Sequence, residues 1–126
     1  MRVRGHSMEP TYRDGKINFC WRPAYWFSAP QRQDVVIVRM AGRRMVFLKR
    51  VVGLPGETVE FRDGRLLVDG QALAEPYVSV RCDWNLPPRR VAQDAVYLVG
   101  DNRSVPIERH RFGQASIDRI LGAPLF

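Results

Sequence analysis

Two side chains that could carry out acyl transfer lie far apart in the sequence, a serine near the N-terminus and a lysine near the middle. Ser7 stands in the segment GHSMEPT at residues 5–11, where Gly5 permits close backbone approach and Pro10 fixes the path of the chain. A serine hydroxyl is a poor nucleophile unless a base takes its proton, and an uncharged lysine can be that base. Such a pair needs neither histidine nor carboxylate. Alone, however, Ser7 would be an ordinary turn serine.

Lys49 lies within an apolar run at residues 45–57 that predicts a strand. Alternate residues of a strand share a face, so Lys49 should point the same way as Phe47 and Val51. Loss of hydration between apolar neighbours lowers the pKa of an ammonium from its reference near 10.4. A pKa of about 7 to 8 would cost roughly 3 to 4 kcal/mol, at about 1.4 per unit. Lys49 is therefore either a base used in chemistry or an edge-strand lysine whose amine reaches water.

Three segments resemble, in order and spacing, the motifs of the type I signal peptidases, Ser/Lys endopeptidases that remove secretory signal peptides: residues 5–11, residues 47–57 and residues 100–103. Residues 33–38 resemble a fourth block of that family, the strand before the lysine segment. By this resemblance Ser7 is the nucleophile and Lys49 the general base. The resemblance also assigns a set of supporting residues: Gly5, Met8, Gly100, Asp101, Asn102, Arg103 and Glu108.

The sequence departs from the family pattern in two places. Pro106, Glu108 and His110 stand where the family has Ser, Asp and Arg, and loss of that Ser removes a hydroxyl expected to orient the lysine amine. Some relatives also use a Ser at the position of Gly5 to stabilise the oxyanion. We therefore expect backbone amides, the Ser7 N–H among them, to act as donors, each worth about 2.7 to 4 kcal/mol of barrier.

The rest of the chain predicts a mainly β fold, one compact domain over residues 1–126 built from antiparallel strands and hairpins with little helix. Dipeptides Asp63-Gly64 and Asp69-Gly70 indicate two tight hairpins, and Ala41 to Arg44 should turn one central strand into the next. The predicted strands are residues 16–20, 34–39, 45–57, 58–62, 65–68, 77–80 and 91–99, with an exposed loop at 81–90 and a helical turn near 116–121.

An aromatic segment, residues 21–30, is bounded by Pro23 and Pro30, which disfavour a helix there. Tryptophan and tyrosine favour the interface between membrane and water, so the segment either dips into lipid or packs on the core as a lid.

Charge and composition indicate which classes of partner the protein could bind. Twenty Lys and Arg against 13 Asp and Glu give a net charge of +7, which favours an anionic partner. Because the arginines are scattered, without a long basic run or a helix-turn-helix pattern, we expect an anionic membrane surface and no nucleic acid. Cys20 and Cys82 have no metal-type spacing and should be free thiols. The proposed chemistry requires no metal or cofactor.

No apolar run of 18 residues and no signal peptide occur in the sequence. Members of the resembled family carry a membrane-spanning segment before the nucleophile, and only six residues precede Ser7 here. We therefore expect a location on the outer face of the bacterial cytoplasmic membrane, with an anchor absent from this chain; a naturally soluble relative is the alternative.

The resemblance implies a serine endopeptidase that cleaves signal peptides from secreted preproteins after small residues, each preprotein being bound as an extended strand. Two alternatives remain open at this point. One is a self-cleaving repressor-type Ser/Lys protease, and the other is an inactive β-barrel module that binds anionic lipid or nucleic acid.

Overall fold

A computed structural model describes residues 6–39, 46–106 and 113–126 of the chain. Within these residues, ten strands form two antiparallel sheets, so the prediction of a mainly β fold is confirmed. The order is β1-β10-β2-β3-β8-β9 in one sheet and β6-β5-β4-β7 in the other. The strands are β1 (Cys20–Trp21), β2 (Val35–Arg39), β3 (Val46–Gly53), β4 (Thr58–Arg62), β5 (Arg65–Val68), β6 (Gln71–Ala72), β7 (Leu86–Arg90), β8 (Ala95–Val99), β9 (Gly113–Ser116) and β10 (Ile120–Pro124).

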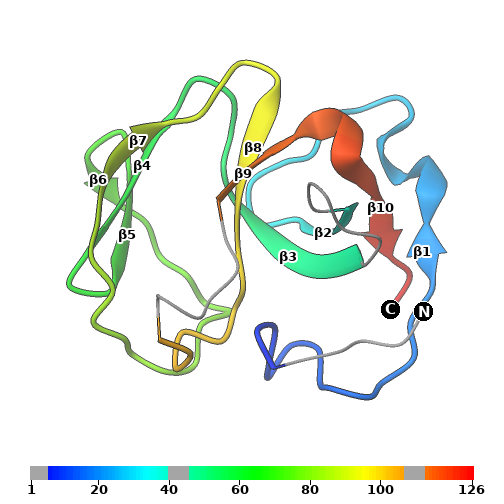
Figure 1. Cartoon of the computed structure of the whole chain (residues 1–126), viewed down its shortest axis with the longest axis horizontal. Coiled ribbons are helices and arrows are strands. Elements are labelled where there is room, and N and C mark those ends of the chain that lie inside the picture. Colours follow the sequence, from blue (N-terminus) through cyan, green and yellow to red (C-terminus); the bar gives the residue numbers. More distant parts are fainter. Residues whose placement is uncertain (1–5, 40–45, 107–112) are drawn as a thin grey trace.

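The two sheets lie side by side, with β4 to β7 in one part of the molecule, β1, β2, β3 and β10 in the other, and β8 and β9 between them (Figure 1). The antiparallel pair β2 and β3 confirms the predicted central pairing, and its register places Val36 opposite Lys49 and Ile37 opposite Leu48. The turn predicted at residues 41–44 lies outside the described residues. On its other side β3 pairs with β8 only from Arg50 onward. No described strand therefore pairs with the second edge of residues 46–49.

Strand β3 contributes to three separate core clusters. Leu48 packs with Met8 and Ile37, Val51 belongs to the cluster around β2 and β8, and Val52 joins the cluster that reaches into the second sheet. Because every part of β3 is held by apolar contacts, the backbone that carries Lys49 is fixed on both faces of its sheet.

Both Asp-Gly hairpins are confirmed. Asp63 and Gly64 connect β4 to β5 with φ of 50° and 80°, and Asp69 and Gly70 connect β5 to β6 with φ of 51° and 81°. Positive φ at both central residues is the geometry whose twist matches that of the flanking strands.

Five strand predictions need correction. β3 ends at Gly53, before a turn at residues 55–56, and of residues 91–99 only Ala95–Val99 form a strand, β8. Of residues 16–20 only Cys20 enters a strand, because the Asn18 side chain accepts the N–H groups of Leu125 and Phe126 and holds the segment without a ladder. Residues 77–80 form no strand. Within the predicted loop 81–90, residues 86–90 form β7, which is an edge strand and so tolerates Pro87 and Pro88.

The C-terminal part is also more regular than predicted. The predicted helical turn is a 3-10 helix, η3 (Ile117–Arg119), and the strands β9 and β10 on either side of it were missed. In the aromatic segment, where we predicted no helix, a single 3-10 turn, η1 (Arg22–Tyr25), has a proline at its start, where the missing N–H costs nothing.

Candidate active site

Ser7 and Lys49 lie in contact although 42 positions separate them. The Lys49 Nζ and Ser7 Oγ atoms share a hydrogen bond of 3.2 Å. Ser7 lies half-buried in a turn at residues 7–10, and Lys49 lies in β3 with 1% of its surface exposed. The turn is fixed by the next residue, Met8, which packs on Ile37 and Leu48 of the central hairpin. The structure thus brings together the hydroxyl and the amine that the sequence singled out.

The loop at residues 100–103 holds the backbone of the serine turn. The Asn102 backbone N–H donates to the Ser7 carbonyl at 2.7 Å, and the Asn102 side-chain amide donates to the His6 carbonyl at 2.8 Å. The Asp101 N–H lies 3.4 Å from the Met8 sulfur. The predicted supporting residues Met8, Asp101 and Asn102 therefore contact the turn directly.

Asp101 also pairs with the residue that follows Lys49. Arg50 donates to both Asp101 oxygens, at 3.0 Å from Nε and 2.5 Å from Nη2, and Thr11 donates to the same carboxylate at 2.6 Å. Burial alone would lower the pKa of Arg50, but the hydrogen bonds to Asp101 and its negative charge outweigh burial and raise it. Arg50 is therefore a permanent cation that links β3 to the loop at residues 100–103.

Arg103 contacts the second sheet and the connections that flank it. Its guanidinium donates to both Glu75 oxygens, at 2.9 and 2.6 Å, and its Nε donates to the Gly100 carbonyl at 2.9 Å. The rings of Phe61 and Trp84 lie 5.3 and 5.4 Å from it. The sequence analysis missed Glu75, and no local pattern marks it, because its partner lies 28 positions away in another loop.

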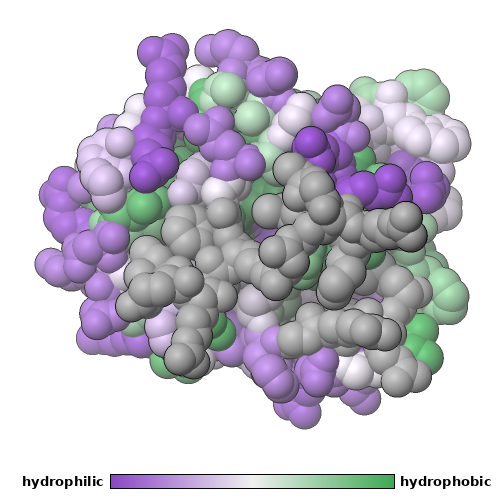
Figure 2. All heavy atoms as spheres, viewed as in Figure 1, coloured by the Kyte–Doolittle hydropathy of each residue, from purple (hydrophilic) through white to green (hydrophobic). Residues whose placement is uncertain are grey.

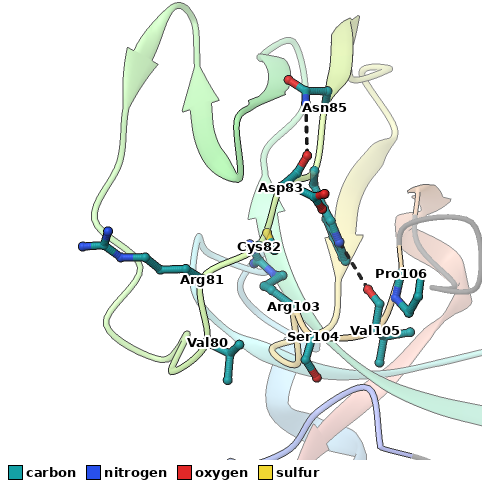
Figure 3. Close-up of a pocket in the computed structure, with 10 residues that line it drawn as sticks. Val80, Arg81, Cys82, Asp83, Asn85, Arg103, Ser104, Val105 and Pro106 are labelled. Atoms are coloured by element: carbon teal, nitrogen blue, oxygen red, sulfur yellow. Dashed lines mark hydrogen bonds between the residues drawn. The ribbon is translucent and has the colours of Figure 1, made fainter.

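A cavity of about 800 Å³ opens beside Arg103 (Figure 3). It is lined by residues 80–85 and 103–106, so neither Ser7 nor Lys49 borders it. Trp84 Nε1 donates to the Val105 carbonyl across it at 3.2 Å, and the exposed Pro106 lies at its rim. The cavity thus adjoins the supporting loop but not the Ser7–Lys49 pair.

Gly5, Glu108 and His110 lie outside the described residues, so the roles predicted for Gly5 and Glu108 stay predictions. Among the residues that the structure does describe, no group of three or more His, Cys, Asp or Glu side chains is arranged to hold a metal ion. Cys20 and Cys82 are free thiols, as predicted.

Comparison with known proteins gives one consistent family. Residues 1–126 match the family described as signal peptidase, peptidase S26. The chain is 31% identical to signal peptidase I of Leptolyngbya laminosa, over 95% of this chain and 63% of the relative. It is 32% identical to signal peptidase I T of Bacillus subtilis, over 98% and 70%. It is 34% identical to the probable signal peptidase I-1 of Synechocystis sp., over 98% and 67%.

Comparison with solved structures gives the same family. The crystal structure of a signal peptidase I from Enterococcus faecalis superposes with a TM-score of 0.61 at 27% identity, covering 76% of this chain and 97% of that one. Against its sequence relatives the chain is shorter, since it spans 63% to 70% of the lengths of the three named above.

Proposed function

The chain belongs to the signal peptidase family, peptidase S26, and we propose that it is a serine endopeptidase that removes signal peptides from secreted preproteins, with residues 1–126 as its catalytic domain. The observation that carries this proposal is the 3.2 Å contact between Ser7 Oγ and the amine of the buried Lys49. In a dry site the charged form of an amine is disfavoured, and an uncharged amine at this distance can accept the serine proton.

The proposed mechanism is acyl transfer in two halves. Lys49 takes the proton of Ser7 as Oγ attacks the carbonyl carbon of the scissile bond, and backbone amides, the Ser7 N–H among them, stabilise the oxyanion. Lys49 then returns the proton to the departing amine, which leaves the signal peptide esterified to Ser7. A water molecule then gives a proton to Lys49 and attacks the ester carbonyl; the C–Oγ bond breaks, the signal peptide leaves with a free carboxyl group, and Lys49 returns the proton to Ser7 Oγ.

The second edge of residues 46–49 offers a place for the substrate backbone. No described strand pairs with this edge, and it ends at Lys49. An extended peptide that adds to it as a strand would run its scissile bond past Lys49 and Ser7. In this proposal shallow pockets select small residues one and three positions before the cut.

A membrane surface is the second partner that we propose. Large hydrophobic side chains stay exposed on one part of the molecule, which we call the apolar surface: Ile17, Phe19, Trp21, Trp26, Phe27, Leu125 and Phe126. In Figure 2 hydrophobic residues reach the outside near β1 and the C-terminus, while hydrophilic residues cover most of the same view. Exposed aromatics beside a net charge of +7 suit an interface with anionic lipid.

No helix within the described part of the chain is long and apolar enough to cross a bilayer. We propose that the protein acts at the outer face of the bacterial cytoplasmic membrane, with the apolar surface in contact with the lipid.

The test is cleavage of a secretory preprotein and of a peptide with an Ala-x-Ala site, with mass spectrometry to identify the cut. Ser7→Ala and Lys49→Met should each lower kcat by a factor of about 10³ or more. The matched controls are Ser28→Ala and Lys16→Met, which change an exposed serine and the chain's exposed lysine and should leave kcat unchanged.

Other outcomes separate the alternatives. A folded wild-type protein that leaves every Ala-x-Ala substrate intact would contradict the proposal and favour a binding module. Cleavage of its own chain in place of the preprotein would favour the repressor-type protease.

A further inference from the structure

Glu75 and Tyr77 lie in the connection between β6 and β7, on the side of the second sheet, and no motif of the sequence marks them. Both side chains are nonetheless tied to the loop that holds the serine turn. Glu75, with 9% of its side chain exposed, accepts two hydrogen bonds from Arg103 and a third, at 2.7 Å, from the Tyr77 hydroxyl.

The Arg103 guanidinium is completely buried, and its position is set from three sides. Glu75 neutralises it, Phe61 and Trp84 lie over it, and its Nε holds the Gly100 carbonyl. Figure 3 shows Arg103 reaching from the loop toward the Cys82 segment, away from Ser104. The first residue of the loop at 100–103 is therefore fixed by an arginine whose charged partner, Glu75, lies in the connection between β6 and β7.

Tyr77 connects the same carboxylate to the strand of Lys49. Its ring lies 4.2 Å below the Arg50 guanidinium, a cation–π contact, and Arg50 in turn binds both oxygens of Asp101. Burial, followed by the charge and the hydrogen bond of Glu75, raises the pKa of the Tyr77 hydroxyl, so the hydroxyl stays a donor at any ordinary pH.

The contacts of Arg103 and those of Arg50 act on the same short loop, residues 100–103. Arg103 binds the loop at Gly100, and Arg50 binds it at Asp101. The next residue, Asn102, donates to the carbonyls of His6 and Ser7. We propose that Glu75 and Tyr77 are positioning residues, which fix the loop at 100–103 through Arg103 and Arg50 and thereby hold Ser7 in line with Lys49. This inference rests on the proposed function, because it assigns the two residues to the same reaction.

The expected signature is a change in kcat without a change in KM, because both residues belong to the connection between β6 and β7 and not to the proposed substrate edge at residues 46–49. Misplacement of reacting groups by a fraction of an ångström to 1 Å can cost up to about 100-fold in rate. We expect Glu75→Gln to lower kcat by about 10- to 100-fold and Tyr77→Leu by about 10-fold. Tyr77→Phe, which keeps the ring below Arg50 and removes only the hydroxyl, should lose about 3-fold.

The matched control is Glu60→Gln. Glu60 is a carboxylate of the same sheet that pairs with Arg62, an exposed arginine on its own strand. It should leave kcat, KM and the exchange rates below unchanged. Thermal unfolding of every variant gives the fraction that is folded at the assay temperature, and the conservative Tyr77→Phe supplies a readout should Glu75→Gln fail to fold.

A second measurement does not depend on cleavage. Hydrogen–deuterium exchange of the Asn102 amide, which is bonded to the Ser7 carbonyl, should be faster in Glu75→Gln and Tyr77→Leu than in wild type. Folded variants with wild-type kcat, or a loss of kcat no larger than the loss of folded protein, would overturn the inference. If the wild type itself cleaves nothing, the proposed function fails, and unchanged exchange at Asn102 would then overturn the positioning role separately.

Discussion

Lys49 is one of only two lysines in a chain that has 20 basic residues. The other, Lys16, is exposed, and the remaining basic residues are arginines, which do not give up a proton in proteins. Of the two lysines, the one in contact with Ser7 is therefore the buried one, where loss of the charge costs least. This division of roles between Lys and Arg is what the proposed chemistry needs.

Asp101 supplies the negative charge that balances Arg50, the residue next to Lys49. Its side chain is fully buried and binds Arg50, whose own side chain is 12% exposed, so Asp101→Asn leaves a largely buried cation without its counter-charge. We expect a loss of about 3 kcal/mol in the free energy of unfolding, measured by urea denaturation.

Thr11→Val serves as the comparison, because it removes one neutral donor from the same carboxylate and should cost about 1 kcal/mol. Equal, small effects of the two substitutions would show that the ion pair does not hold the loop at 100–103.

At this scale the sequence predicted that Ser7 and Lys49 lie together, and the two side chains are 3.2 Å apart. The pair of Arg50 and Asp101 was not predicted. The pair of Glu75 and Arg103 was missed because two charges 28 positions apart carry no local signal, and Tyr77 was assigned to a strand.

Local turn chemistry explains which elements were predictable. Asp-Gly dipeptides fix both hairpins of the second sheet, since few other residues accept positive φ twice in succession. β10 is different, because it is defined by pairing with β2, more than 80 positions away, and its short segment shows no alternation of apolar and polar residues. β7 was hidden by Pro87 and Pro88, which only an edge position permits.

Gly53 is the last residue of β3, after which the chain leaves the first sheet and continues to β4 of the second. A Cβ atom there would lie 2.5 Å from the buried Val59 side chain and 3.0 Å from Tyr97 Cβ. Gly53→Ala should therefore lower the free energy of unfolding by about 1 to 3 kcal/mol through overpacking. Urea denaturation checks this, with Gly70→Ala as a second variant: its Cβ would meet nothing within 4 Å, so only its positive φ is penalised. A Gly53→Ala variant as stable as wild type would mean that residue 53 is packed less tightly against Val59 and Tyr97 than the structure shows.

Glu57, just before β4, binds the Arg32 guanidinium and the Leu54 N–H. The Arg32 hydrogen bonds lower the pKa of Glu57, and the backbone hydrogen bond adds to this against the opposing effect of burial. A carboxylate with a lowered pKa stabilises the fold fully above its ordinary value of about 4.5, and this contribution is lost as pH falls through the folded-state pKa.

Glu57→Gln should therefore lower the free energy of unfolding by about 1 kcal/mol at pH 7, and the difference from wild type should shrink between pH 4.5 and pH 3. Denaturant titrations at several pH values measure it. A difference that stays constant or grows on acidification would contradict this role of Glu57.

For the molecule as a whole, the question is how a basic protein with no spanning helix among its described residues would meet a membrane. Trp26 is 68% exposed and Phe27 is 96% exposed, and both follow η1 in the aromatic segment, whose Tyr25 packs on the core. One residue of the segment thus covers the core while its neighbours face outward, and the contact of these neighbours with lipid stays a prediction.

The double variant Trp26→Ser and Phe27→Ser should bind vesicles containing phosphatidylglycerol about tenfold more weakly than wild type in a sedimentation assay. Added salt should weaken the binding of both proteins by screening the positive charge. Val80→Ser, which changes an exposed apolar residue outside the apolar surface, is the control. Equal binding by all three proteins would place the membrane contact elsewhere.

The most direct test of the central claim is NMR of the lysine side chains, since with two lysines the spectrum of ¹³C- and ¹⁵N-labelled protein holds two signals and Lys49→Met identifies one of them. We predict that the Lys49 amine is uncharged at pH 8, and that it becomes protonated at the pH where cleavage declines. A fully charged Lys49 at pH 8, as the reference lysine value of about 10.4 would give, would contradict its role as the base for Ser7.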